Sequence, residues 1–307
     1  MFTKPQRLHK GDTVAIVSPS WGGPSVFPHV YENGLQALKD LGLKIKEFST
    51  ARESVDVLRN NPQMRAEDIN SAFADSGIKA IFTSIGGDDS VRILPYLDKE
   101  VIKKNPKILM GYSDTTTLHV FCNLLGLTTL YGPSIMAGFS QMENLPKRFR
   151  QHVETMLFNP EEAREYFAYG EYVDGYPNWS DRDTVGQVNF LKKDDGWKWL
   201  QGEGTIQGEL FGGCMEVLGM LKATPNWPHL DFWDGKIFFM ETSEAKSPRY
   251  QVDHELRNYG AQGVFERISG FLVGRARDYA DQEKKELYLR FPNQNPIQSQ
   301  LSSSCME

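Results

Sequence analysis

The feature that most constrains the fold is a regular alternation of two hydrophobic patterns between residues 12 and 125. Short β-branched and apolar runs, such as residues 78–84, alternate with segments whose apolar positions recur at helical spacing, such as Val30, Leu35 and Leu38. Strands separated by helices pair in parallel, because a parallel pair needs a long crossover connection. The alternation therefore predicts an α/β N-terminal domain in which helices cover both faces of a parallel sheet.

The remaining sequence predicts a second, smaller α/β domain. Residues 140–205 are rich in Gly, Asp, Trp and Tyr with weak periodicity, which indicates a long loop or hairpin between two domains. Residues 204–228 pass from a strand into a helix across a Gly-Gly pair, and residues 235–244 form an apolar strand ending in a carboxylate. Residues 250–276 read as a helix followed by a strand.

The elements expected in the N-terminal part are strands over 12–20, 43–48, 78–84 and 107–113, and helices over 30–42, 64–76 and 88–105. These patterns divide the 307 residues into an N-terminal α/β domain (1–165), a connecting loop or insertion (166–205) and a C-terminal domain (206–307) that is incomplete at its end.

Composition excludes several classes of partner. The formal net charge is −6, so the chain lacks the basic excess that nucleic acids and anionic membranes select. No stretch has the length of a signal h-region or a membrane span. The three cysteines are widely spaced without a CxxC pair, so a zinc site or disulfide framework is not expected. No phosphate-loop or dinucleotide fingerprint is present either. We expect a cytoplasmic protein without cofactor or metal.

The stretch "KILMGYSDTTTLHVF" places Ser113 where a buried strand turns abruptly into a helix. Ligands of α/β proteins gather at the carboxyl ends of strands, and a tight turn there exposes a hydroxyl beside helix amides. This arrangement is typical of a nucleophile elbow, in which the next amide, here that of Asp114, helps to hold an oxyanion. The alternative is a simple helix cap, because Ser and Asp are good capping residues.

A second glycine-rich turn follows the strand 78–84. In "SIGGDDS", Gly86 and Gly87 could supply another oxyanion donor or an anion-binding nest. The alternative is an ordinary glycine-rich connection between a strand and a helix.

A serine nucleophile needs a base and an acid that orients the base. His119 lies six positions after Ser113, about 120° around the same helix, so we expect it to be packed in the core. His254 stands among charged residues and is expected in solvent. The best candidate for the acid is Glu241, a carboxylate that follows four apolar strand residues, whereas Glu244 is expected to cap a helix or face solvent.

Several motifs in order resemble the LD-carboxypeptidase superfamily of two-domain serine peptidases. They are "GDTVAIVSPS", "IFTSIGGDDSVRILPYLD", "KILMGYSDTT", "TLYGPS", "GELFGGCMEVL" and "IFFMETSE", within residues 11–276. The resemblance implies a metal-free Ser-Glu-His triad with Ser113 as the nucleophile and Glu241 as the acid. It places the oxyanion amides at Asp114, Gly86 and Gly87, and it implies a homodimer.

The superfamily has two relevant branches. Murein LD-carboxypeptidases release D-alanine from tetrapeptides and usually carry an arginine before the Gly-Gly pair, where this chain has Ile85. The MccF-like branch cleaves aminoacyl or peptidyl nucleotides and carries a loop with a tryptophan, here Trp179. Its ring could stack on a purine or simply pack the loop. Ile85 and this loop favour the MccF-like branch.

The chain departs from the superfamily at its C-terminal end. The triad histidine of the family comes well after the glutamate, but no histidine follows His254. The segment 287–307 resembles none of the closing elements of the family, which predicts a truncated chain or a frame change near residues 287–292. The third hypothesis about function is therefore a catalytically inactive homologue that sequesters its ligand.

Overall fold

The computed structural model describes residues 2–277 and 279–288. The chain forms two compact units, one up to Asp194 and one from Asp195 onward. Both units contain a parallel sheet with helices, which confirms the expected α/β class with two domains. Within the described residues, no helix combines the length and the apolar character that crossing a membrane requires.

The first unit is built on a five-stranded parallel sheet in the order β2-β1-β3-β4-β5. Its strands are β1 (Thr13–Val17), β2 (Lys44–Glu47), β3 (Ile78–Thr83), β4 (Ile108–Gly111) and β5 (Leu130–Tyr131). The order reverses between β1 and β3, and ligands of such sheets bind beside that point, at the carboxyl ends of the strands. The segments after β3 and β4 are those that carry the glycine pair and Ser113.

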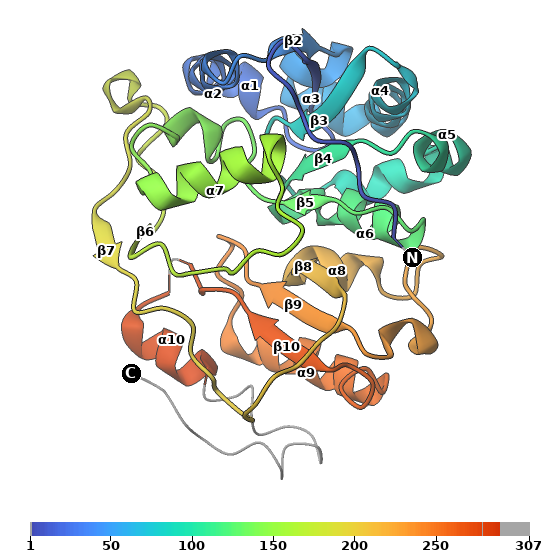
Figure 1. The fold of residues 1–307 in the computed structure, drawn as a ribbon, viewed down its shortest axis with the longest axis vertical. Coiled ribbons are helices and arrows are strands. Elements are labelled where there is room, and N and C mark those ends of the chain that lie inside the picture. Colours follow the sequence, from blue (N-terminus) through green and yellow to red (C-terminus); the bar gives the residue numbers. More distant parts are fainter. Residues whose placement is uncertain (1, 278, 289–307) are drawn as a thin grey trace. The chain divides into compact units, whose positions relative to one another are not determined.

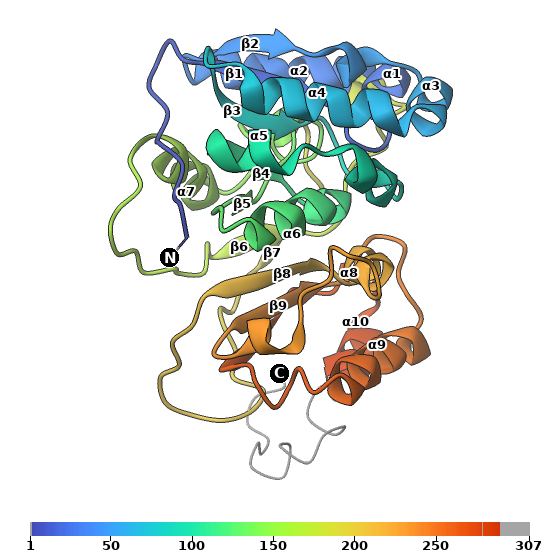
Figure 2. The ribbon, with the colours of Figure 1, turned by 90° about the vertical axis from the view of Figure 1, so that its right-hand side faces the viewer.

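Helices cover both faces of this sheet (Figures 1 and 2). They are α1 (Gly23–Val26), α2 (Pro28–Asp40), α3 (Val55–Asn60), α4 (Pro62–Ala74), α5 (Lys99–Lys104), α6 (Thr116–Leu124) and α7 (Lys147–Phe158). One buried cluster joins α2 and α7 to alternate residues of the strands, among them Val14, Ile16 and Phe82. Since successive strand residues point to opposite faces, the intervening residues, such as Ala15 and Ile81, are buried on the other face.

The expected helix over 88–105 is wrong as a single element. The structure has a 3₁₀ turn, η2 (Ser90–Tyr96), followed by the short helix α5. Pro95 interrupts the segment, because proline lacks the amide that a continuous helix needs. Asp98 then starts α5 as its N-cap, since its carboxylate accepts hydrogen bonds from the amides of Glu100 and Val101, each at 3.0 Å.

The reading of 140–205 as loop or hairpin is correct only in part. Strands β6 (Glu171–Val173) and β7 (Leu191–Lys193) form the antiparallel hairpin. Helix α7 was missed, although Phe149, Val153 and Leu157 recur every four residues and pack on the core of the first unit. The 3₁₀ turns of this unit are η1 (Ser49–Arg52), η2, η3 (Ser113–Thr115), η4 (Phe139–Gln141) and η5 (Arg182–Thr184).

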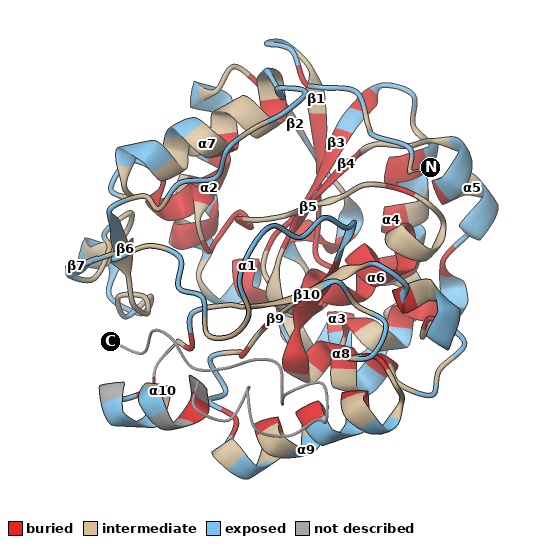
Figure 3. Ribbon diagram, turned by 60° about the horizontal axis from the view of Figure 1, so that its bottom comes forward, coloured by how far each residue is buried: buried red, intermediate tan, exposed pale blue. Residues whose placement is uncertain are grey.

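The second unit contains a three-stranded parallel sheet in the order β10-β9-β8. Its elements are β8 (Leu210–Cys214), α8 (Met215–Leu221), η6 (Leu230–Trp233), β9 (Ile237–Glu241), α9 (Arg249–Ala261), β10 (Gly270–Val273) and α10 (Asp281–Tyr288). The fully buried Trp233 contacts the rings of Phe211, Phe238 and Tyr259, which joins the sheet to α9 in one aromatic core. In Figure 3 the buried residues of α9, in red, recur along the helix among less buried ones.

Candidate active site

Ser113 occupies a strained turn between β4 and α6. Its φ is 57°, in the left-handed region that non-glycine residues rarely adopt. A residue held there costs about 1–3 kcal/mol, and such strain tends to concentrate at functional sites. The backbone therefore has the sharp strand-turn-helix form that the sequence predicts for a nucleophile elbow.

Gly111 makes this turn sterically possible. A Cβ at residue 111 would lie 2.2 Å from Thr83 Oγ1 and 2.8 Å from Thr115 Oγ1, closer than real contacts allow. The hydroxyls of Thr83 and Thr115 are themselves 3.1 Å apart. Only glycine fits between β3 and the first turn after Ser113.

We expect Gly111→Ala to lower the free energy of unfolding by about 1–3 kcal/mol, since overpacking in a buried site has this cost. Urea denaturation followed by circular dichroism measures the change. Gly132→Ala is the matched control, because its new Cβ would meet its nearest neighbour, Met110, at an ordinary 3.6 Å. Equal stability of the two variants would contradict the steric argument.

The side chain of Ser113 does not act as a helix cap. No hydrogen bond joins its hydroxyl to any residue that the structure describes, while its amide donates to Tyr131 Oη at 3.0 Å. The residue is partly exposed. The hydroxyl therefore stabilises no local structure among the described residues, and a nucleophile requires such an available hydroxyl.

The glycine pair lies directly against this serine. A Cβ at Gly86 would be 3.0 Å from Ser113 Cβ, 3.1 Å from its Oγ and 3.4 Å from the Asp114 amide nitrogen. Gly87 has a φ of 146° and packs against Ser20. Among the described residues, the amides of Gly86, Gly87 and Asp114 donate to no acceptor. The structure therefore places Gly86 beside Ser113, and the three amides without an acceptor lie on the segments that follow β3 and β4.

The carboxylate of Asp114 is a feature that sequence reasoning missed. It is fully buried, and its Oδ2 accepts hydrogen bonds from the amides of Asp89 (3.0 Å) and Ser90 (2.8 Å). Burial raises the pKa of this carboxyl, and the two amide bonds act in the opposite direction. The buried Arg65, which binds Asp89, was also not singled out. No local pattern marks it, because its partner lies 24 residues away.

His119 is packed in the core, as the sequence predicts. Its Nε2 donates to the carbonyl of Gly111 at 2.8 Å, so Nδ1 accepts from the hydroxyl of Thr129, also at 2.8 Å. Burial lowers the pKa of His119 to about 4. Both ring nitrogens are engaged, so this histidine cannot serve Ser113 as a base. Among the described residues no histidine bonds to Ser113, and His254 is exposed as expected.

Trp179 packs within the first unit. Its ring lies 5.8 Å from that of Phe27 and 5.4 Å from that of Tyr176, and its carbonyl accepts from His29 Nε2 at 2.7 Å. Tyr176 in turn shares a hydrogen bond with the hydroxyl of Tyr112, which precedes Ser113 in the chain. The tryptophan loop is therefore tied to the turn that carries the serine.

Glu241 ends β9 in the second unit, and its position is described within that unit alone. It pairs in register with Cys214, the last residue of β8. Glu216 was not singled out from the sequence. Its carboxylate accepts hydrogen bonds from the segment between β9 and α9, namely from the Ser243 amide (3.1 Å) and the Ser247 hydroxyl (2.7 Å). Burial and the nearby Glu241 and Glu216 carboxylates raise the pKa of the Cys214 thiol, so this thiol is not an activated nucleophile.

The altered C-terminal segment expected from residue 287 lies almost wholly outside the described residues, which end at 288.

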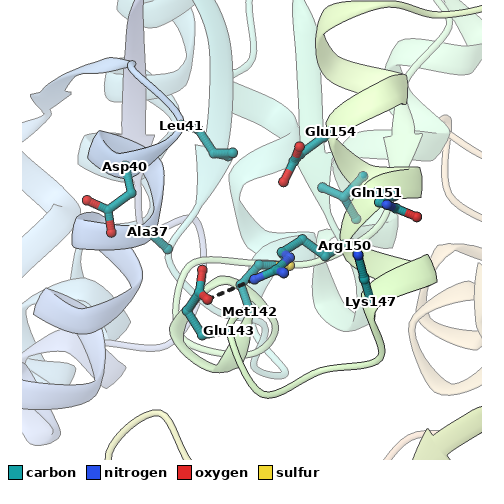
Figure 4. Close-up of a pocket in the computed structure, with 10 residues that line it drawn as sticks. Ala37, Asp40, Leu41, Met142, Glu143, Lys147, Arg150, Gln151 and Glu154 are labelled. Atoms are coloured by element: carbon teal, nitrogen blue, oxygen red, sulfur yellow. Dashed lines mark hydrogen bonds and ion pairs between the residues drawn. The ribbon is translucent and has the colours of Figure 1, made fainter.

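A pocket of about 290 Å³ lies between α2 and α7 and includes none of the candidate residues (Figure 4). Its charged side chains include Arg150 and Glu143, which pair at 2.8 Å.

Comparison with known proteins matches both units to one family. Residues 14–132 match the LD-carboxypeptidase N-terminal domain, and residues 207–300 match the LD-carboxypeptidase C-terminal domain. The putative carboxypeptidase YocD of Bacillus subtilis is 30% identical over 88% of this chain and 79% of its own length.

Two other relatives carry more specific names. A probable murein peptide carboxypeptidase of Bacillus subtilis is 29% identical over 88% of this chain and 74% of its own. The microcin C7 self-immunity protein MccF of Escherichia coli is 24% identical over 87% and 76%. Among solved structures, an MccF-like protein of Streptococcus pneumoniae in complex with AMP has a TM-score of 0.81 and 29% identity, covering 93% of this chain and 88% of that one.

Proposed function

Because this chain belongs to the LD-carboxypeptidase family, we propose that it is an MccF-like serine peptidase that hydrolyses an amide bond in aminoacyl or peptidyl nucleotides. The observation that carries the proposal is the position of Gly86 beside Ser113, together with the amides of Gly86, Gly87 and Asp114, which have no acceptor among the described residues. The AMP complex of the Streptococcus pneumoniae relative supports a nucleotide as part of the substrate.

In the proposed reaction Ser113 Oγ attacks the carbonyl carbon of the scissile amide. The three amides donate to the oxygen that becomes negative in the tetrahedral intermediate, where such donors contribute most to the rate. The C–N bond then breaks, the amine leaves with a proton, and water hydrolyses the acyl-enzyme. Glu241 is assigned the orienting carboxylate of the family, while no residue of this chain is assigned the role of the base.

Two alternatives make different predictions about product. A murein carboxypeptidase would release D-alanine from a tetrapeptide, as the name of the Bacillus subtilis relative suggests. An inactive homologue would bind an aminoacyl nucleotide and release no product.

The deciding experiment incubates the purified chain with an aminoacyl sulfamoyl adenosine and, separately, with a murein tetrapeptide. Mass spectrometry of the products distinguishes the three candidate functions. Isothermal titration with the unhydrolysed adenosine compound measures binding. Free amino acid from the first substrate supports the proposed function. D-alanine from the second alone would replace it with the murein reading, and tight binding without either product would replace it with sequestration.

We expect Trp179→Ala to raise KM for the adenosine substrate by about tenfold, since stacking of a base on an aromatic ring contributes roughly 1–3 kcal/mol. The value of kcat should change little. Steady-state kinetics measures both, with the half-exposed Trp199→Ala as control. A lower melting temperature with an unchanged KM would assign Trp179 to packing alone.

Oligomeric state is a separate proposal. We expect a homodimer from the resemblance to the superfamily, and light scattering after size exclusion would measure the mass directly.

A further inference from the structure

The loop that follows β3 is bound tightly to one residue after the serine. Asp114 Oδ2 accepts from the amides of Asp89 and Ser90, and the carbonyl of Asp114 accepts from Ser90 Oγ at 2.7 Å. Ser90 Oγ also lies 2.7 Å from Thr117 Oγ1. This loop carries Gly86 and Gly87 a few residues earlier. Three hydrogen bonds to Asp114 and one to Thr117 therefore join the two segments that supply the unpaired amides.

Arg65 of α4 binds the same loop. Its side chain is fully buried, and its Nη2 donates to Asp89 Oδ2 at 2.8 Å. Its Nη1 donates to the carbonyl of Pro19, after β1, at 2.8 Å and to the carbonyl of Asp89 at 3.3 Å. A buried charge is costly unless it is paired, so Asp89 is the counterion that holds the guanidinium in place.

We infer that Arg65 and the Asp114 carboxylate, acting through Asp89 and Ser90, form a clamp that positions the Gly86–Gly87 turn against Ser113. The inference rests on the proposed function for its catalytic meaning, because it assigns positioning residues to the same oxyanion-binding amides. It adds a role for two side chains that are fully buried.

The need for a clamp follows from the turn itself. Gly87 is exposed and has a positive φ, and neither glycine of the turn has a side chain with which to anchor it. Oxyanion donors act only when they are held in place before the reaction. The clamp supplies this rigidity from the buried side of the loop, where Asp114 and Arg65 are excluded from water.

Asp114→Ala is the main test, because it removes the acceptor of the Ser90 amide and the nearer acceptor of the Asp89 amide, which also donates to Ser20 Oγ at 3.2 Å. We expect hydrogen exchange of residues 86–90 to become faster by roughly tenfold or more, the effect of losing a buried hydrogen bond. With a turned-over substrate, kcat should fall up to roughly 100-fold through misplacement of the donors, while KM changes less.

Asp114→Asn is the rescue variant. Both amides bond to the same carboxylate oxygen, so the single carbonyl oxygen of asparagine can accept them. We expect its exchange rates and kcat to stay within about threefold of the parent protein, since one acceptor oxygen retains both bonds. Loss equal to that of Asp114→Ala would overturn the geometric basis of the clamp.

Asp68→Ala is the matched control for a merely structural effect. Asp68 is another buried carboxylate of the first unit that accepts a backbone amide, that of Thr50, at 2.6 Å. Its loss should destabilise the unit without selective exchange at residues 86–90. If Asp68→Ala and Asp114→Ala accelerate this segment equally, the clamp is overturned.

Ser90→Ala serves if Asp114→Ala does not fold. It removes the bonds from Ser90 Oγ and keeps the amide bonds, so a smaller, selective acceleration at residues 86–90 is expected. No acceleration would count against the clamp. The exchange readout is independent of turnover. A parent protein that hydrolyses neither substrate would therefore overturn the proposed function, while exchange still decides the clamp.

Discussion

Ser113→Ala should reduce hydrolysis of an aminoacyl sulfamoyl adenosine by at least about a thousandfold, because removal of a nucleophile leaves only binding and oxyanion stabilisation. The loss should appear in kcat, since the substitution removes one oxygen from a partly exposed side chain that has no hydrogen-bond partner among the described residues. Product formation followed by mass spectrometry measures it, and titration with the same compound should give a similar affinity.

The control for this prediction is Ser76→Ala, at an exposed serine between α4 and β3. It should retain the parent rate. A parent protein that is no faster than Ser113→Ala would remove the serine from the chemistry. Equal tight binding by both, without product, would instead identify a sequestering homologue. The comparison therefore distinguishes a catalytic Ser113 from a serine in a homologue that binds the ligand without hydrolysing it.

Acidification should destabilise the first unit through His119. The ordinary histidine pKa of 6.5 falls to about 4 for this buried ring, so between these values the unfolded chain binds a proton that the folded chain does not. The free energy of unfolding should therefore decrease as pH falls from 6.5 to 4. A difference of about 2.5 pH units corresponds to roughly 3 kcal/mol at about 1.4 kcal/mol per unit.

Urea denaturation at several pH values between 7.5 and 4 measures this dependence. His119→Gln should flatten the curve by about that amount, whatever it costs at neutral pH, because glutamine does not titrate. His254→Gln is the matched control at an exposed histidine and should leave the slope unchanged. A slope that survives in His119→Gln would mean that other groups cause it.

The expected loss also bears on the site. The proton on His119 Nε2 binds the carbonyl of Gly111, two residues before Ser113. Charging the ring would place a positive charge in a buried site, and it would add a proton at Nδ1, so that the Thr129 hydroxyl that now donates would have to turn and accept. The turn that carries the serine should therefore be among the first parts to loosen in acid.

Local pattern was enough to predict most of the scaffold. The buried runs at 78–84 and 107–113 became β3 and β4, because short apolar runs between helical periods have few other solutions. The sharp turn at Ser113 followed from a glycine and a serine between a strand and a helix. The packing of His119 followed from its angle on α6.

Sequence reasoning failed where a local rule was misapplied. Pro95 should have divided the helix over 88–105, and the four-residue spacing of Phe149, Val153 and Leu157 marks α7. Both signals were readable in the chain. They were masked by the charged residues of the first segment and the irregular composition around the second.

What the sequence determined by itself is the α/β class, the family and the sharp turn at Ser113, since each depends on residues close together in the chain or on motifs in order. Only the tertiary structure decided that the hydroxyl of Ser113 is no helix cap, that Gly86 lies beside it, and that Arg65 and Asp114 bind the same loop. These contacts join residues about 24 or more positions apart. The physical reason is that hydrogen bonds and ion pairs between strand ends depend on how the sheet is ordered, and no local periodicity encodes that order.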